Sequence, residues 1–203
     1  MRTEIRTYNI YSFDELSKEV QAKVIERYKS DEWIIENRDN DFYYYCLKYF
    51  QKLFPNSDIE LQYSLSYCQG DGLEVYGSFN FLDLLHWNIS DFSEKEVKTL
   101  TYYFTNIVRD NCKLDGNRHY CYYSHKVEDF YYPIVDDLEV ANTRDINYEV
   151  IEKFSKITNR TLERVCYSWA DIGYDMIYNI TDEEIINEIN ANEYEFLADG
   201  TEW

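Results

Sequence analysis

The sequence has 203 residues, of which 39 are acidic and 20 are basic, so its formal net charge at pH 7 is −19. A charge of this size disfavours nonspecific binding to nucleic acid or anionic lipid, because both are repelled before contact, and it favours basic partners. The aromatic content of 18%, with 22 Tyr and 11 Phe, excludes a disordered acidic tail. The length fits one domain that buries most of its apolar surface.

Cysteine usage and hydropathy indicate a cytoplasmic location. The five Cys residues show no paired spacing, which is typical of reduced thiols. The N-terminal segment lacks an apolar core of signal-peptide length, and nowhere do about 18 apolar residues run together. We therefore expect a protein that is neither secreted nor membrane-spanning.

The N-terminal quarter predicts a short strand followed by two helices. The strand is expected over Glu4–Tyr11. Ser12 and Glu15 have the spacing of a capping box, in which each side chain bonds the other residue's amide, and the helix behind them is expected to run to about Tyr28. A second helix is expected from residue 31 to 54, because a broad apolar face ends there at a proline.

The centre of the sequence is a predicted β-hairpin over residues 59–81. Apolar and polar residues alternate in both limbs, which is the two-residue period of a half-buried strand. The limbs are joined at residues 69–72, where glycines allow a tight turn. We predict an α+β fold, with an antiparallel sheet built on this hairpin and covered by amphipathic helices.

Three further segments follow the hairpin. Residues 82–89 fit either a short helix or a loop, and a capping box at Ser93–Glu96 opens an amphipathic third helix. A turn at Asp115–Asn117 and a Tyr-rich strand over Arg118–Val127 predict a second hairpin that extends the sheet. Pro133–Arg144 is predicted to be an acidic connection.

The C-terminal part predicts a long helix, a short helix and a terminal strand with a turn. The long helix covers Asn147–Tyr178, and its predicted buried face includes Ile172; Gly173 marks a kink or the point where the helix frays. A third capping box, Thr181–Glu184, opens the short helix, and the strand lies within Tyr194–Trp203. We expect one α+β domain over 1–203, with an acidic helical C-terminal region over 146–203.

The acidic residues of this C-terminal region are the candidate binding site. From Val165 onward the sequence contains ten acidic residues and no Lys or Arg. Closely spaced carboxylates repel each other, and a protein that occupies a Lys- or Arg-lined groove built for phosphates would need such a face. The candidate partner-binding residues are Asp171, Asp175, Asp182, Glu183, Glu184, Glu188, Glu193 and Glu195. The alternative is a solvated surface that maintains solubility.

A metal site is a second interpretation, which the spacing disfavours. Cys112, His119, Cys121 and His125 lie close in the sequence. His119 and His125 would stand roughly 20 Å apart on a flat strand, too far for one ion. We therefore expect no metal and no cofactor.

Catalysis is a third interpretation. The sequence has only three His and contains no nucleophile elbow, phosphate-binding loop or His-Glu-x-x-His motif. Asp71, or the pair Asp136 and Asp137, would be the catalytic carboxylates of a small hydrolase. Turn formation explains Asp71 more simply, so a non-enzymatic protein is expected.

Three short motifs resemble a family of small acidic proteins encoded by bacteriophages and prophages. The first is Tyr11–Ser17 (YSFDELS), followed by Ala22-Lys23 and Ile25. The second is the turn Tyr67–Gly72 (YCQGDG), in which Cys68 replaces the family's usual Ser. The third is Asn192–Phe196 (NEYEF), with Asp199-Gly200 after it.

The resemblance implies a role in the cytoplasm of an infected bacterium, since phage accessory proteins of this size and acidity include anti-CRISPR proteins and DNA mimics. The expected function is therefore non-enzymatic inhibition of a basic host nucleic-acid-binding protein, for which a CRISPR nuclease is the leading class. An antitoxin-like protein that neutralises a basic toxin is the alternative. Direct binding to nucleic acid or membrane is not expected, and the Tyr-rich strands leave homodimerisation open.

Overall fold

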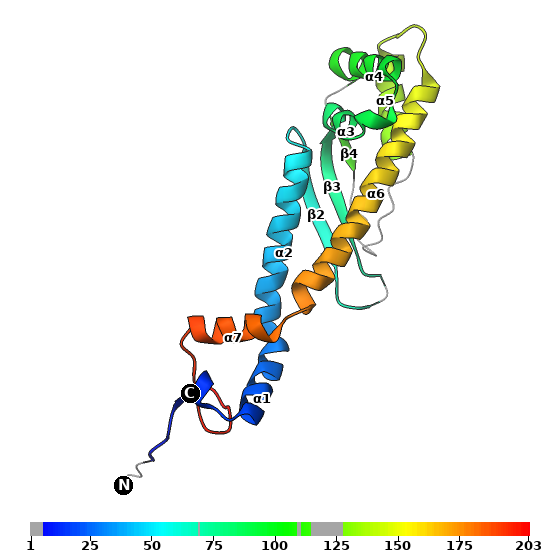
Figure 1. Cartoon of the computed structure of the whole chain (residues 1–203). Helices are drawn as coiled ribbons and strands as arrows, with labels where there is room; N and C mark the ends of the chain where they lie inside the picture. Colours follow the sequence, from blue (N-terminus) through cyan, green and yellow to red (C-terminus); the bar gives the residue numbers. More distant parts are fainter. Residues whose placement is uncertain (1–5, 69, 109–110, 115–127) are drawn as a thin grey trace. The chain divides into compact units, whose positions relative to one another are not determined.

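The computed structural model describes residues 6–68, 70–108, 111–114 and 128–203 (Figure 1). Its elements are β1 (Tyr11–Ser12), η1 (Phe13–Glu15), α1 (Lys18–Lys29), α2 (Glu32–Leu53), β2 (Asp58–Ser64), β3 (Gly72–Asn80), α3 (Phe81–Trp87), η2 (Ile89–Asp91), α4 (Glu94–Asn106), β4 (Asn111–Leu114), α5 (Glu128–Val140), α6 (Tyr148–Tyr178), α7 (Asp182–Ala191) and β5 (Glu195–Phe196). Helices combined with antiparallel strands confirm the predicted α+β class.

The chain divides into two compact units. Unit 1 consists of residues 1–42 and 175–203, and unit 2 consists of residues 43–174. The divisions fall within α2 and α6, so the acidic region predicted for 146–203 is shared between the units. The single domain predicted over 1–203 stays a prediction.

Unit 1 joins the two ends of the described chain in a short antiparallel sheet. In this sheet β1 pairs with β5, which places Tyr11 opposite Phe196 and Ser12 opposite Glu195. In the same unit α1 packs against α7. The buried core of the unit comprises Phe13, Leu16, Val24, Tyr28, Ile34, Ile180, Ile185, Ile189 and Phe196. The predicted terminal strand with a turn is confirmed, because β5 is followed by a turn in which the Gly200 amide donates to the Leu197 carbonyl.

The strand predicted over Glu4–Tyr11 is wrong over most of its described length. Residues 6–10 are irregular, and residues 1–5 lie outside the described ranges. Pairing extends over two residues because β5, the partner, is itself only two residues long. The Ser12–Glu15 capping box exists, but it caps η1, and α1 begins separately at Lys18 after Ser17.

The sheet of unit 2 confirms the predicted central hairpin. β2 and β3 pair antiparallel from Asp58 opposite Ser78 to Ser64 opposite Gly72. The tight turn predicted at 69–72 is wrong, because β2 already ends at Ser64 and a longer loop joins the strands. In this loop the amides of Ser66 and Cys68 donate to the Asp71 carboxylate and not to a partner strand. β4 adds to the other edge of β3, so the sheet is extended as predicted. The turn at 115–117 and the strand at 118–127 that were also predicted lie outside the described residues.

Two positions on β3 depart from simple alternation. Gly77 has a φ of +116°, and a Cβ there would come within 2.4 Å of the Asp58 carbonyl oxygen, so the close approach of β2 requires glycine. Glu74, one of the polar residues of the alternating pattern, is only 2% exposed. β3 is the central strand of the sheet, and both of its faces are covered at this point.

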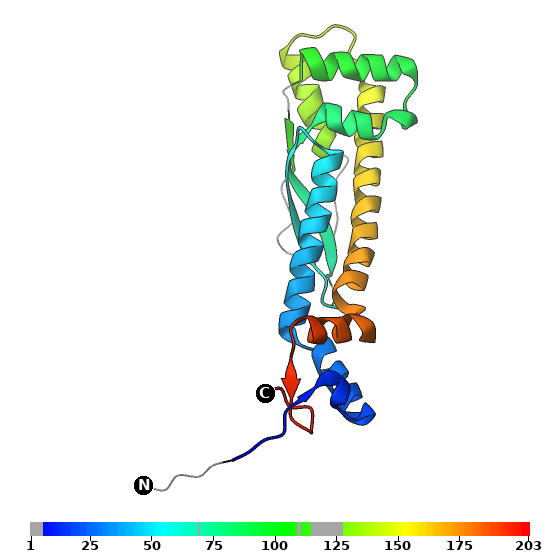
Figure 2. The same cartoon turned by 60° about the vertical axis from the view of Figure 1, so that its left-hand side comes forward.

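Helices of unit 2 run alongside the strands, as Figures 1 and 2 show for α6 and the later turns of α2. Phe54, the residue after α2, meets Phe79 of β3 edge-on, with ring centroids 5.5 Å apart. Tyr49 of α2 contacts Trp169 of α6 at 5.1 Å. These aromatic contacts confirm that amphipathic helices cover the sheet.

Local signals correctly place α3 and α4. Residues 82–89, left open between helix and loop, are mostly helical in α3. The Ser93 amide donates to the Glu96 carboxylate in the predicted capping box. This hydrogen bond, supported by Lys153 of α6, lowers the pKa of Glu96 to about 2. The same carboxylate therefore begins α4 and ties it to α6.

The acidic connection predicted at Pro133–Arg144 is wrong, because α5 continues to Val140. A proline inside a helix removes one amide donor and costs about 3 kcal/mol. Phe130, Ile134 and Leu138 recur every four residues and are fully buried, and Phe130 contacts Phe79 of β3. Burial of this apolar face offsets the cost of the proline.

The predicted long helix is confirmed as α6, which continues through Gly173. Its predicted buried face is wrong at Ile172, which is 41% exposed, whereas Ala170 and Ile177 are buried. Ile172 lies two residues from Ala170, and a separation of two residues is roughly half a helical turn. Among the helices in the described ranges, none combines the length and apolar character needed to cross a membrane.

Candidate functional site

The excess negative charge is concentrated in unit 1. This unit has 19 acidic and 7 basic residues, a net charge of −12, whereas the larger unit 2 has 20 acidic and 13 basic residues, a net charge of −7. About a third of the chain therefore carries most of the excess. Unit 1 is therefore the candidate functional region.

Two hollows of unit 1 lie beside Trp33, which is 56% exposed at the start of α2. The larger, of about 460 Å³, lies between α2 and α7 and is lined by three carboxylates and one cation: Asp41, Glu184, Glu188 and Arg38. The smaller, of about 180 Å³, is lined by Asp31, Glu188 and Glu202 together with the rings of Tyr28 and Tyr194. Carboxylates thus stand next to an accessible indole ring.

A third hollow of unit 1, of about 350 Å³, lies where α2 meets the end of α6. Glu32, Glu36 and Asp39 of α2 line it, opposite Ile177 and Tyr178. No Lys or Arg belongs to its lining. In all three hollows, carboxylates are combined with an aromatic ring, and this combination suits the cationic end and the apolar stem of a Lys or Arg side chain.

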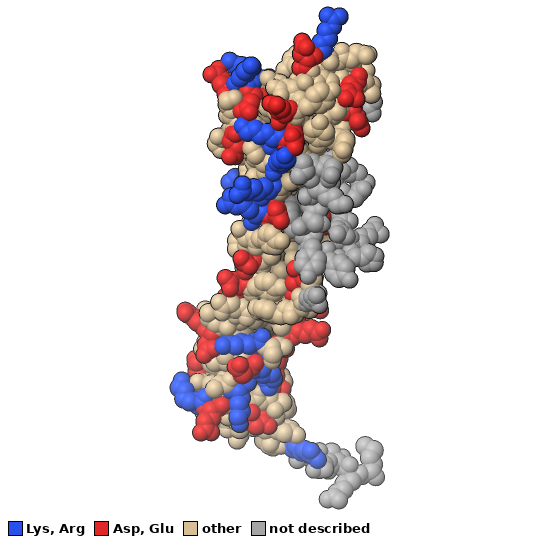
Figure 3. All heavy atoms as spheres, turned by 90° about the vertical axis from the view of Figure 1, so that its right-hand side faces the viewer, with Lys and Arg blue, Asp and Glu red and all other residues tan. Residues whose placement is uncertain are grey.

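Tertiary structure neutralises two of the predicted site residues. Asp182 forms an ion pair with Lys29 of α1, with an N–O distance of 2.5 Å. Glu184 forms an ion pair with Arg38 of α2, with an N–O distance of 3.2 Å. Figure 3 shows basic side chains among the acidic ones on the face that it presents. The C-terminal carboxylates are therefore not all free of cations, although the C-terminal sequence contains none.

Glu184 has a structural role as well. Thr181 donates its amide and its hydroxyl to the Glu184 carboxylate, which completes the predicted capping box of α7. These hydrogen bonds, with a smaller contribution from Arg38, lower the pKa of Glu184. Arg38 also donates to the carbonyl oxygen of Met176 at 2.6 Å. Glu184 and Arg38 thus bind α7 to α2 and to the end of α6.

The other predicted residues are dispersed. Asp175 and Glu183 are exposed in unit 1, and Glu188 is half-buried between two of the hollows. Glu193 and Glu195 are exposed around β5, whereas Asp171 belongs to unit 2. The prediction missed the acidic residues 31–41, which comprise the first half of α2 and the residue before it. The five carboxylates of this segment, against one Arg, were visible in the sequence, but their position beside α7 was not.

A hydrogen bond at the other end of unit 1 fixes Glu202. The hydroxyl of Tyr28 donates to the Glu202 carboxylate at 2.7 Å. Burial, followed by this hydrogen bond, raises the pKa of Tyr28 well above its usual value. The hydroxyl therefore stays protonated and holds the carboxylate at the wall of the smallest hollow.

Asp71, the alternative catalytic residue, is the hydrogen-bond acceptor that organises its own loop in unit 2. It accepts hydrogen bonds from the Ser66 and Cys68 amides, the Ser64 hydroxyl and, at 2.6 Å, the Tyr174 hydroxyl of α6. Burial raises the pKa of Asp71, but the hydrogen bonds from Cys68, Tyr174 and Ser64 outweigh it and hold the pKa well below the ordinary 3.8. This arrangement supports the structural interpretation of Asp71.

Substitution of Asp71→Asn is expected to destabilise unit 2 by about 1 to 2 kcal/mol, a value discounted for partial exposure. The pKa of Asp71 falls on folding, so its contribution is complete above the ordinary value of 3.8 and is lost as the pH decreases toward the folded pKa. Urea unfolding of both proteins at pH 7 and pH 3 measures the difference. If the free energies of unfolding of the two proteins differed equally at both pH values, the ionised Asp71 carboxylate would not be the stabilising form.

The described residues do not support the other two candidate sites, the Asp136–Asp137 pair and the metal set. Asp136 and Asp137 are neighbours on α5, and Asp136 is exposed. Of the proposed metal set, His119, Cys121 and His125 lie outside the described residues, and only the backbone of Cys112 is described, in β4. Within the described residues, no group of His, Cys, Asp or Glu is placed to hold a metal ion.

Comparison with known proteins provides no family assignment. No protein-family model, no curated protein and no solved structure matches the chain.

Proposed function

We propose that this protein is a non-enzymatic phage inhibitor of host defence, which binds a basic nucleic-acid-binding protein through unit 1 and partly mimics DNA or RNA. The leading partner class is a CRISPR nuclease of the infected bacterium. The observation that carries the proposal is the set of three hollows of unit 1, each lined by three carboxylates and at least one aromatic ring.

Recognition would use charged side chains of the partner. Lys and Arg that normally hold phosphates would enter the hollows and form charge-assisted hydrogen bonds with Glu36, Asp41 and Glu188. Trp33 would receive the apolar stem or the face of a guanidinium. The partner would release counterions from its groove, as it does when it binds nucleic acid, so binding should weaken with salt.

Tagged full-length protein is used to capture partners from a lysate of a bacterium that carries CRISPR and restriction systems, with washes at low and high salt. We expect a basic nuclease at low salt, lost at high salt, and displaced by added guide RNA or target DNA. A second tagged protein, with Asp91, Asp136 and Glu163 of unit 2 changed to Lys, is the control for net charge. Because the hollows of unit 1 are unchanged in it, this protein should still capture the nuclease.

Three results would contradict the proposal. A captured nuclease that nucleic acid does not displace would exclude competition for a phosphate-binding groove. A basic toxin enzyme in place of a nuclease would favour the antitoxin-like alternative. Capture of no basic protein at low salt would indicate that the carboxylates of unit 1 are a solvated surface.

A further inference from the structure

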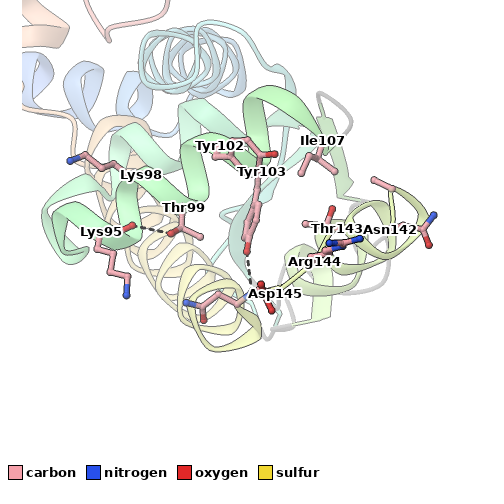
Figure 4. A pocket seen from close by; sticks show the side chains of 12 residues that line it. Lys95, Lys98, Thr99, Tyr102, Tyr103, Ile107, Asn142, Thr143, Arg144 and Asp145 are labelled. Carbon is pink, nitrogen blue, oxygen red and sulfur yellow. Dashed lines mark hydrogen bonds between the residues drawn. The ribbon is translucent and has the colours of Figure 1, made fainter.

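Unit 2 contains a hollow of about 880 Å³, and all of its lining residues belong to unit 2. One wall is the exposed side of α4, and the other is the loop 141–147 between α5 and α6 (Figure 4). The Tyr103 hydroxyl accepts a hydrogen bond from the Asn147 amide at 3.0 Å and joins the two walls. The volume lies in the range typical of small-molecule sites.

The charge of this hollow is opposite to that of the protein. Its lining includes three cations, Lys95, Lys98 and Arg144, and one carboxylate, Asp145. Lys98 forms an ion pair with Glu94, but no ion pair involves Lys95 or Arg144 within the described ranges. Figure 4 shows these two residues on opposite sides of the hollow, with Tyr103 between them. Two cations in a chain of net charge −19 are thus available to an anion.

The other groups of the lining could contact the uncharged parts of a ligand. Tyr102 is 56% exposed and offers a ring on which a planar base can stack. The hydroxyl oxygen of Thr143 is buried and has no hydrogen-bond partner within the described ranges. Asp145 is an acceptor suited to sugar hydroxyls, and its φ of 57° is a left-handed conformation that Asp and Asn tolerate better than most residues.

We infer that this hollow binds a nucleotide. Lys95 and Arg144 would hold the phosphates, Tyr102 would stack on the base, and Asp145 would accept hydrogen bonds from the ribose. This set of side chains favours a nucleotide over inorganic phosphate. The Asp145 carboxylate repels a phosphate but can accept hydrogen bonds from the two hydroxyls of a ribose.

Calorimetric titration of the full-length protein at low salt with ATP, tripolyphosphate and adenosine tests the inference. We expect ATP to bind with one-to-one stoichiometry and more tightly than either fragment. Lys95→Ala and Arg144→Ala should each weaken ATP binding about tenfold. Lys156→Ala, which removes a cation of α6 outside the hollow, should leave it unchanged.

Asp145→Asn provides the sharpest test, because it keeps a residue that tolerates the backbone conformation. We expect it to weaken ATP binding and to strengthen tripolyphosphate binding. The inference is overturned if neither ATP nor tripolyphosphate binds at millimolar concentration, if tripolyphosphate binds as tightly as ATP, or if Lys156→Ala weakens ATP binding as much as Lys95→Ala. All substituted side chains are exposed, and circular dichroism confirms that each variant is folded.

Discussion

The triple variant Glu36→Lys, Asp41→Lys, Glu188→Lys is expected to weaken binding of the basic partner by at least about 100-fold. Each of the three hollows of unit 1 loses at least one carboxylate and gains a cation in this variant. A Lys or Arg of the partner would then meet a like charge where it had met a hydrogen-bond acceptor. Surface plasmon resonance with the captured partner, at a series of salt concentrations, measures the loss.

Folding should not account for this loss. Unit 1 has a net charge of −12, so three added cations reduce its self-repulsion, and its melting temperature should be unchanged or higher. Asp182 and Glu184 stay native because they pair with Lys29 and Arg38. The matched variant of unit 2, with Asp91, Asp136 and Glu163 changed to Lys, should bind within about threefold of wild type. Equal losses in both triple variants would mean that net charge, and not unit 1, determines affinity.

Phe154→Ala is expected to reduce the free energy of unfolding of unit 2 by about 3 to 5 kcal/mol. Phe154 of α6 is fully buried, and its ring lies 5.0 Å from that of Phe104 and within 6.5 Å of those of Phe81 and Phe92. Truncation removes the centre of this aromatic cluster and leaves a cavity among α3, α4 and α6. Amide hydrogen exchange of α6 in increasing urea measures the loss.

Tyr167→Ala is the matched control for Phe154→Ala. Tyr167 lies on the same helix but is 54% exposed, so its truncation should change the free energy of unfolding by about 0.5 kcal/mol or less. Equal effects of the two substitutions would contradict the aromatic cluster as the core of unit 2. Unit 1, whose core is separate, should keep its hydrogen-exchange protection in both variants.

Features that depend on residues close together in the chain could be predicted from the sequence. Alternation on either side of Gly70–Gly72 predicted the hairpin, because successive strand residues point to opposite faces. The capping boxes at Ser93–Glu96 and Thr181–Glu184 predicted the starts of α4 and α7, because their hydrogen bonds span three residues. The acidic C-terminal region was equally visible, since charge is a property of composition.

Features that depend on residues distant in the sequence could not be predicted, because they form only when the helices and strands pack together. Pro133 indicates the end of a helix, yet α5 continues through it because Phe130 and Ile134 are buried in the core of unit 2. The pairing of Asp182 with Lys29 and of Glu184 with Arg38 joins residues more than 140 positions apart, and the hollows form only where α2 meets α7 and the end of α6. Local hydrogen bonds and side-chain period specify elements, whereas the neutralisation of a charge and the shape of a binding surface depend on how those elements pack.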